Sequence, residues 1–67
     1  MHLLTPMASP GRRRLEALLV KKGWNYERLA VELGARSTTV YRWLSDRTRP
    51  QPVFRRLLQE RFGVRWD

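Results

Sequence analysis

Apolar residues recur along this chain at the spacing that buries one face of a helix. Leu15, Leu18 and Leu19 stand at i, i+3 and i+4, and residues spaced in this way lie on one side of an α-helix. Similar spacings appear in three further segments, with the apolar sets Leu29, Ala30 and Leu33; Val40, Trp43 and Leu44; and Phe54, Leu57 and Leu58. Because no segment alternates apolar and polar residues as a strand does, the pattern predicts an all-α fold, a compact bundle of four or five short helices.

Residues that start and stop helices bracket each of these segments. Ser9 is a typical N-cap with Pro10 at the first helical position, and Asn25 is a typical N-cap for the second helix. The third helix is predicted over residues 37–45, and Pro52 begins the fourth. Glycine readily takes the left-handed conformation that ends a helix, and it follows three of the segments, at Gly23, Gly34 and Gly63.

The length of 67 residues is enough for one small domain. Residues 1–9 show no helical period and contain Pro6, so we expect a flexible N-terminal arm followed by one folded domain at residues 10–67. Four aromatic residues fall on apolar helical faces and are interpreted as core rather than as stacking platforms: Trp24, Trp43, Phe54 and Phe62.

Composition excludes most kinds of chemistry. The chain has no cysteine, and its single histidine, His2, falls in the expected arm, so a Cys-based zinc site, a thiol nucleophile, a His-rich metal site and a catalytic histidine pair are excluded. We therefore expect no enzyme activity, no cofactor and no small-molecule ligand. No apolar run approaches the roughly 20 residues that span a bilayer, and the N-terminus lacks the order of a secretory signal. These features predict a cytoplasmic protein without a membrane partner.

Positive charge is concentrated in two segments of the chain. The sequence has 14 Lys and Arg residues against 6 Asp and Glu residues, a formal net charge of +8. Residues 11–22 carry +4 and residues 36–56 carry +5, whereas residues 23–35 carry −1 and residues 57–67 are neutral. A solubilising surface would spread its charge more evenly, and a localised positive footprint is what phosphate binding requires. The charge pattern therefore favours nucleic acid as the partner.

The stretch from Tyr26 to Ser45 has the pattern of two helices locked across a sharp turn. Ala30 stands four residues before Gly34, where a larger side chain would push the helices apart. Gly34 can take the positive φ that a tight turn needs, and Val40 follows at a spacing that returns it to the apolar face of the preceding helix. These are the physical requirements of a helix-turn-helix.

This stretch resembles the phage lambda repressor and Cro-like helix-turn-helix DNA-binding family. The matching residues are Leu29, Ala30, Leu33, Gly34, Val40, Tyr41, Arg42, Trp43, Arg49 and Pro50. The resemblance covers roughly residues 11–64, and residues 34–50 match the family's turn, recognition helix and following loop without an insertion. Arg36 stands where members often have a Ser or Thr N-cap, so the cap is expected to shift to Ser37. Asp46 stands where members often have glycine, and aspartate tolerates the left-handed conformation.

The resemblance implies that the helix at residues 37–45 enters the major groove of double-stranded DNA and reads an operator. The base-reading candidates lie on this helix: Ser37, Thr38, Tyr41 and Arg42. Candidates for contact with the DNA backbone lie at the start of the second helix, in the turn and in the following loop: Asn25, Tyr26, Arg36, Arg47 and Arg49. The basic run Arg12, Arg13 and Arg14 supplies candidate arm contacts, and Arg55 and Arg56 are further backbone candidates.

These features predict a small sequence-specific transcriptional regulator of the repressor or Cro type. Because one subunit offers few base contacts, we expect a weak homodimer formed on DNA. The candidate surface is the tail at Val64, Arg65 and Trp66 together with exposed parts of the fourth helix. The resemblance also implies a bacterial or phage-infected cell. The alternative is a helix-turn-helix module that binds a protein partner such as RNA polymerase or another regulator. The polar, positive outer face of the third helix favours DNA, because a protein interface more often exposes apolar groups.

Overall fold

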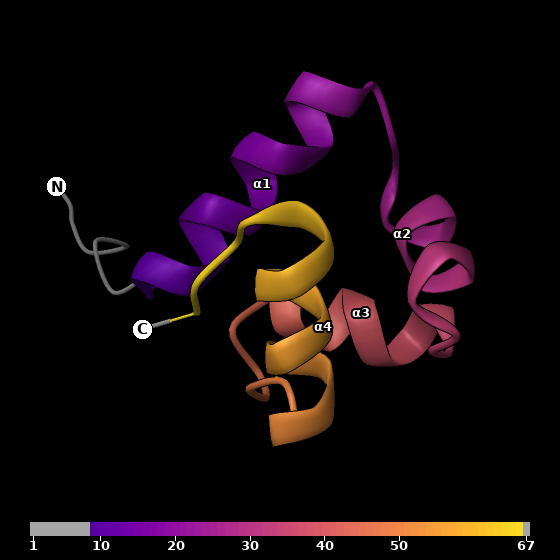
Figure 1. The fold of residues 1–67 in the computed structure, drawn as a ribbon. Helices are drawn as coiled ribbons and strands as arrows, with labels where there is room; N and C mark the ends of the chain where they lie inside the picture. The colour runs from indigo at the N-terminus through magenta and orange to yellow at the C-terminus, as the bar shows by residue number, and fades with distance from the viewer. Residues whose placement is uncertain (1–8, 67) are drawn as a thin grey trace, which may run out of the picture.

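Residues 9–66, which the computed structural model describes, fold into four α-helices joined by short connections (Figure 1). The helices are α1 (Pro10–Lys22), α2 (Tyr26–Leu33), α3 (Ser37–Leu44) and α4 (Pro52–Phe62). This part of the chain contains no strand, so the predicted all-α fold is confirmed. None of the four helices is both long and apolar enough to cross a membrane. The arm predicted at residues 1–9 lies outside the described residues, except for Ser9.

The N-caps predicted for α1 and α2 are confirmed. Ser9 Oγ accepts a hydrogen bond from the Arg12 N–H at 3.2 Å, and Asn25 Oδ1 accepts one from the Arg28 N–H at 2.8 Å. Such a cap gives a partner to a backbone donor that the helix leaves free, and it stabilises the helix by about 1 kcal/mol. The cap matters most for α2, because a helix of eight residues is marginal on its own.

Helix α3 begins at Ser37 as predicted, but its N-cap differs from the prediction. Arg36 occupies the N-cap position without a side-chain cap hydrogen bond, and Ser37 is the first helical residue. The expected shift of the cap to Ser37 is therefore wrong, because Arg36 already supplies the extended backbone of a cap, with φ −82° and ψ 146°. The helix ends at Leu44 with Ser45 as C-cap. Asp46 follows with a left-handed φ of 59°, so aspartate does occupy the conformation in which the resemblance leads one to expect glycine.

The four helices share one apolar core. Every helix and the segment after α4 contribute buried apolar side chains to it: Leu15, Leu18, Leu29, Ala30, Leu33, Val40, Trp43, Leu58, Val64 and Trp66. Trp43 is 1% exposed, and its ring centroid lies 5.5 Å from that of Phe54, so it joins α3 to α4. Trp24, Phe54 and Phe62 pack against the edge of this core, which confirms the interpretation of the four aromatic residues as core.

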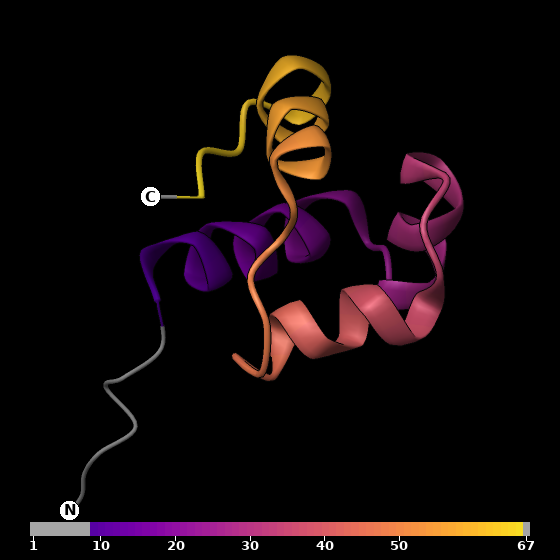
Figure 2. The same ribbon diagram turned by 90° about the horizontal axis from the view of Figure 1, so that it is seen from below.

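The residues after α4 complete the core instead of forming an exposed tail. Val64 and Trp66 are 6% and 5% exposed, whereas Arg65 between them faces solvent. The chain reverses at Gly63 and runs back toward the start of α1 (Figures 1 and 2), where Trp66 packs against Gly11. Alternation of this kind is typical of extended backbone, and it buries both apolar residues. Val64 and Trp66 are therefore not available for the dimer surface that the sequence suggested, and the homodimer itself stays a prediction.

Candidate nucleic-acid interface

Helices α2 and α3 form the most extensive helix pair of the described fold. The turn between them begins at Gly34, whose φ is 72°, and the Ala35 N–H donates to Ala30 O at 2.9 Å. Figure 2 shows α3 running across the end of α2 rather than alongside it. Ala30 is 2% exposed and Val40 is fully buried, as expected for a small residue and an apolar residue that hold two helices together across a turn.

One face of α3 is exposed and polar. Thr38, Tyr41 and Arg42 stand at i, i+3 and i+4 and are all exposed, so the structure brings three of the four predicted base-reading residues together. Ser37, the fourth, is half-buried, because it precedes Val40 by three residues and therefore lies toward the core-facing side of the helix. The exposed polar face of α3 therefore comprises three of the four predicted base-reading residues instead of all four.

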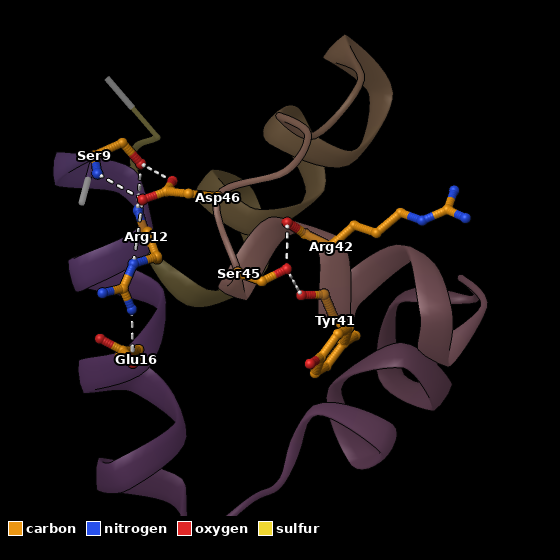
Figure 3. A network of polar contacts seen from close by, with 7 residues as sticks. All are labelled: Ser9, Arg12, Glu16, Tyr41, Arg42, Ser45 and Asp46. Atoms are coloured by element: carbon orange, nitrogen blue, oxygen red, sulfur yellow. Dashed lines mark hydrogen bonds and ion pairs between the residues drawn. The ribbon is translucent and has the colours of Figure 1, made fainter. Parts of the chain in front are cut away.

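Arg42 extends its side chain away from the protein (Figure 3). Its guanidinium makes no hydrogen bond or ion pair within residues 9–66. The backbone beneath it is held firmly, because Arg42 O accepts from the Arg47 N–H at 2.9 Å and Ser45 Oγ donates to Tyr41 O at 2.9 Å. The planar guanidinium of Arg42 has free N–H donors, and its backbone is fixed by hydrogen bonds. Such a group suits bidentate binding of a base edge or a phosphate.

Tyr41 connects the exposed face of α3 to the start of α2. Its ring centroid lies 5.5 Å from that of Tyr26, with 58° between the ring planes. Tyr41 is 52% exposed, whereas Tyr26 is half-buried. Aromatic pairs contribute about 0.5–1.5 kcal/mol beyond the area that they bury, so this contact helps to hold a predicted base-reading residue beside a predicted backbone residue.

A shallow cavity of about 280 Å³ lies beside Arg42, between α3 and the loop that leads to α4. Arg42 and Arg49 both line it, together with the aromatic residues Trp43 and Phe54. Three polar residues that we did not predict complete its lining: Thr39, Thr48 and Gln51. Thr39 precedes Arg42 by three residues, a spacing that indicates a shared helix face. The positions of Thr48 and Gln51 depend on the path of the loop, which no periodicity predicts.

The predicted backbone contacts flank α3 on both sides along the chain. Arg36, in the turn before α3, and Arg47 and Arg49, in the loop after it, are exposed. Their guanidiniums have no partner within the part of the chain that the structure describes. Asn25 is also exposed, but its side-chain oxygen is engaged as the cap of α2, which leaves only its amide NH₂ for a ligand.

The carboxylate of Asp46 ties the loop after α3 to the start of α1 (Figure 3). Ser9 donates to it from its backbone N–H at 3.3 Å and from Oγ at 3.2 Å, and Arg12 Nε lies 3.4 Å from Oδ2. Arg12 also pairs with Glu16 at 2.9 Å, and its side chain is only 22% exposed. Arg12 thus makes its ion pairs with residues of the domain, whereas the sequence suggested that it contacts DNA as part of a basic arm. The sequence pattern pointed to Asp46 only for its backbone conformation, because Ser9 lies 37 residues away.

Arg13 and Arg14 belong to the first turns of α1 and are exposed. An Arg14 guanidinium nitrogen donates to Arg65 O at 2.9 Å, which joins α1 to the segment after α4. The basic run is therefore part of the beginning of α1, and its contact with DNA stays a prediction.

Positive and polar side chains thus gather around the exposed face of α3. Comparison of the chain with known protein families, with curated proteins and with solved structures gives no match. The function of this face can therefore be proposed only from the chemistry of its own residues.

Proposed function

We propose that this protein is a sequence-specific DNA-binding transcriptional regulator of the lambda repressor and Cro-like kind, which inserts α3 into the major groove of an operator. The observation that carries the proposal is the exposed polar face of Thr38, Tyr41 and Arg42 on a helix fixed across α2. The major groove, about 12 Å wide, admits a helix of about 10–12 Å diameter. The face also carries the residue types that read base edges.

Arg42 is the principal base-reading residue in this proposal. Its free guanidinium can donate two parallel hydrogen bonds to O6 and N7 of a guanine, a contact that discriminates against other bases by about 1–3 kcal/mol. Thr38 offers a hydroxyl that donates and accepts, and its methyl group can contact a thymine methyl. Tyr41 stands beside them, steadied by the ring of Tyr26.

Arg36, Arg47 and Arg49 supply the contacts to the phosphate backbone. They flank α3 at both ends, so each can meet a phosphate at the edge of the groove while the helix lies inside it. A phosphate contact releases a condensed counterion and adds about 0.9 to the slope of log K against log salt concentration. Such contacts position the protein but carry no sequence information of their own.

Substitution of Arg42 by alanine tests the base-reading role. Arg42→Ala should cost about 1–3 kcal/mol on the preferred site and relax the preference at one base pair. Arg47→Ala and Arg49→Ala should weaken binding to all sequences alike and lower the salt slope by about one each. Lys21→Ala, on α1, removes the same charge away from α3 and is the matched control. Unchanged sequence preference in Arg42→Ala would overturn the assignment of Arg42.

A selection of bound duplexes from random DNA tests the function itself. Enrichment of a sequence is expected, and an inverted pair of half-sites about 34 Å apart would support a homodimer assembled on the operator. Enrichment of no sequence would refute the proposal and favour the alternative, a module that binds RNA polymerase or another regulator.

A further inference from the structure

A second cavity, of about 200 Å³, lies between α4 and the segment that follows it. Arg55, Arg56 and Gln59 line it from α4, and Arg65 and Trp66 line it from the returning chain. None of these residues lines the cavity beside Arg42. The reversal of the chain after α4 (Figure 1) therefore brings together arginines that are up to ten residues apart in the sequence.

The positive charge of this cavity is uncompensated within residues 9–66. The three guanidiniums that line it have no ion pair or hydrogen bond in this part of the chain, and no carboxylate of this part lines it. Arg65 accepts a hydrogen bond from Arg14 only through its backbone oxygen. Like charges held close together repel one another, and a bound anion would remove that repulsion.

Trp66 adds an independent observation. The residue is 5% exposed, and its buried indole Nε1 has no hydrogen-bond acceptor within the described residues. Buried donors are almost always paired, with protein, water or an ion. Trp66, which lines the cavity, therefore has an indole N–H without an acceptor, and the three arginines that line the cavity have no anionic partner within the described residues.

We propose that this cavity binds a phosphoryl group. Guanidinium groups match the tetrahedral oxygens of a phosphate through parallel N–H···O bonds, the Gln59 amide adds a further donor, and the volume suits one phosphoryl with the group to which it is attached. The phosphoryl belongs either to the DNA backbone or to a free phosphorylated molecule. In the first case the proposal rests on the proposed function and extends it, by adding a phosphate contact from α4 and the segment that follows it.

Inorganic phosphate is the probe for the cavity itself. The full chain is titrated at constant ionic strength against a chloride control, and the three indole N–H signals are followed by NMR, with Trp66→Phe assigning the Trp66 signal. We expect the Trp66 signal to shift more than those of Trp24 and Trp43. The double variant Arg56→Gln/Arg65→Gln should lose this shift, whereas Lys21→Gln, an equal charge change per residue outside the cavity, should keep it. No selective shift in the wild-type chain would overturn the proposal.

Binding to a random-sequence duplex distinguishes the two sources. If the ligand is a DNA phosphate, the double variant Arg56→Gln/Arg65→Gln should lower the salt slope by about one, because the cavity holds a single phosphoryl group, and Lys21→Gln should leave the slope unchanged. A phosphate-induced shift together with an unchanged slope would assign the cavity to a free phosphorylated molecule. Because the phosphate titration contains no DNA, a chain that binds no duplex but shows the Trp66 shift would refute the proposed function and support the cavity.

Discussion

Gly11→Ala is expected to destabilise this domain, although alanine is the better helix former. Gly11 is the second residue of α1 and is buried under the segment that follows α4. A Cβ at this position would overlap the backbone oxygen of Trp66 and the ring atoms Cδ2 and Cγ. The oxygen belongs to the main chain and Trp66 as a whole is 5% exposed, so neither the oxygen nor the ring can move aside without displacing the returning segment.

Two opposing effects set the size of the change. In a helix, glycine is less favourable than alanine by roughly 0.5–1 kcal/mol, and the substitution gains at most this amount. Overpacking a core typically costs about 1–3 kcal/mol, so we expect a net loss of about 1–2 kcal/mol. A chain of 67 residues has a total stability of about 3–10 kcal/mol, and each kcal/mol shifts the Tm of so small a domain by about 4–8 °C.

Urea denaturation followed by circular dichroism measures this loss. Ala17→Gly, at an exposed position of the same helix, is the control that measures helix propensity without a packing change, and it should cost about 0.5–1 kcal/mol. A Gly11→Ala chain that is as stable as the wild type, or more stable, would refute the close packing of Trp66 on α1. It would also remove the basis for placing Trp66 in the wall of the arginine cavity.

Three further predictions concern the loop, the core and the assembly. Asp46→Ala should lower the free energy of unfolding in urea by about 1 kcal/mol more than Asp46→Gly does, because both lose the carboxylate but only glycine takes the left-handed φ freely; equal free energies for the two variants would contradict the backbone constraint. Trp43→Ala should lower the free energy of unfolding by about 3–5 kcal/mol, because so large a buried side chain is removed. Val53→Ala, at a residue 57% exposed, should change it by less than about 0.5 kcal/mol, and an equally small loss in Trp43→Ala would count against the core assignment. Sedimentation of the free protein at micromolar concentration should give a monomer. The exposed large apolar residues lie on four different helices, at Val20, Val31, Tyr41 and Val53, and so do not form one apolar surface for a second copy. A tight dimer would contradict this expectation.

The helices and most of their ends could be predicted from the sequence because the interactions that set them are local. A cap joins residues three apart, as in Ser9 with Arg12 and Asn25 with Arg28. An apolar stripe repeats within a single helical turn or two. The N-cap of α3 shows the limit of this reasoning. N-cap preference describes a side chain, whereas the position of this cap is set by the backbone of Arg36.

Much of the candidate interface was also predictable from local pattern. Thr38, Tyr41 and Arg42 share an exposed face because they stand at helical spacing opposite the buried Val40 and Trp43. The lining of the cavity beside Arg42 was only partly predictable, because Thr48 and Gln51 reach it through a loop without periodicity.

The sequence by itself determined the helical segments, the joint between α2 and α3, and the concentration of charge near α3. Only the tertiary structure decided where Val64 and Trp66 lie, which partner holds Asp46, and which arginines share a cavity. These outcomes depend on contacts between residues as far apart as Ser9 and Asp46, or Arg14 and Arg65. Residues so distant meet only when the whole core has formed, because burial of apolar surface by the helices, rather than any local preference, fixes the path of the loops and of the returning chain.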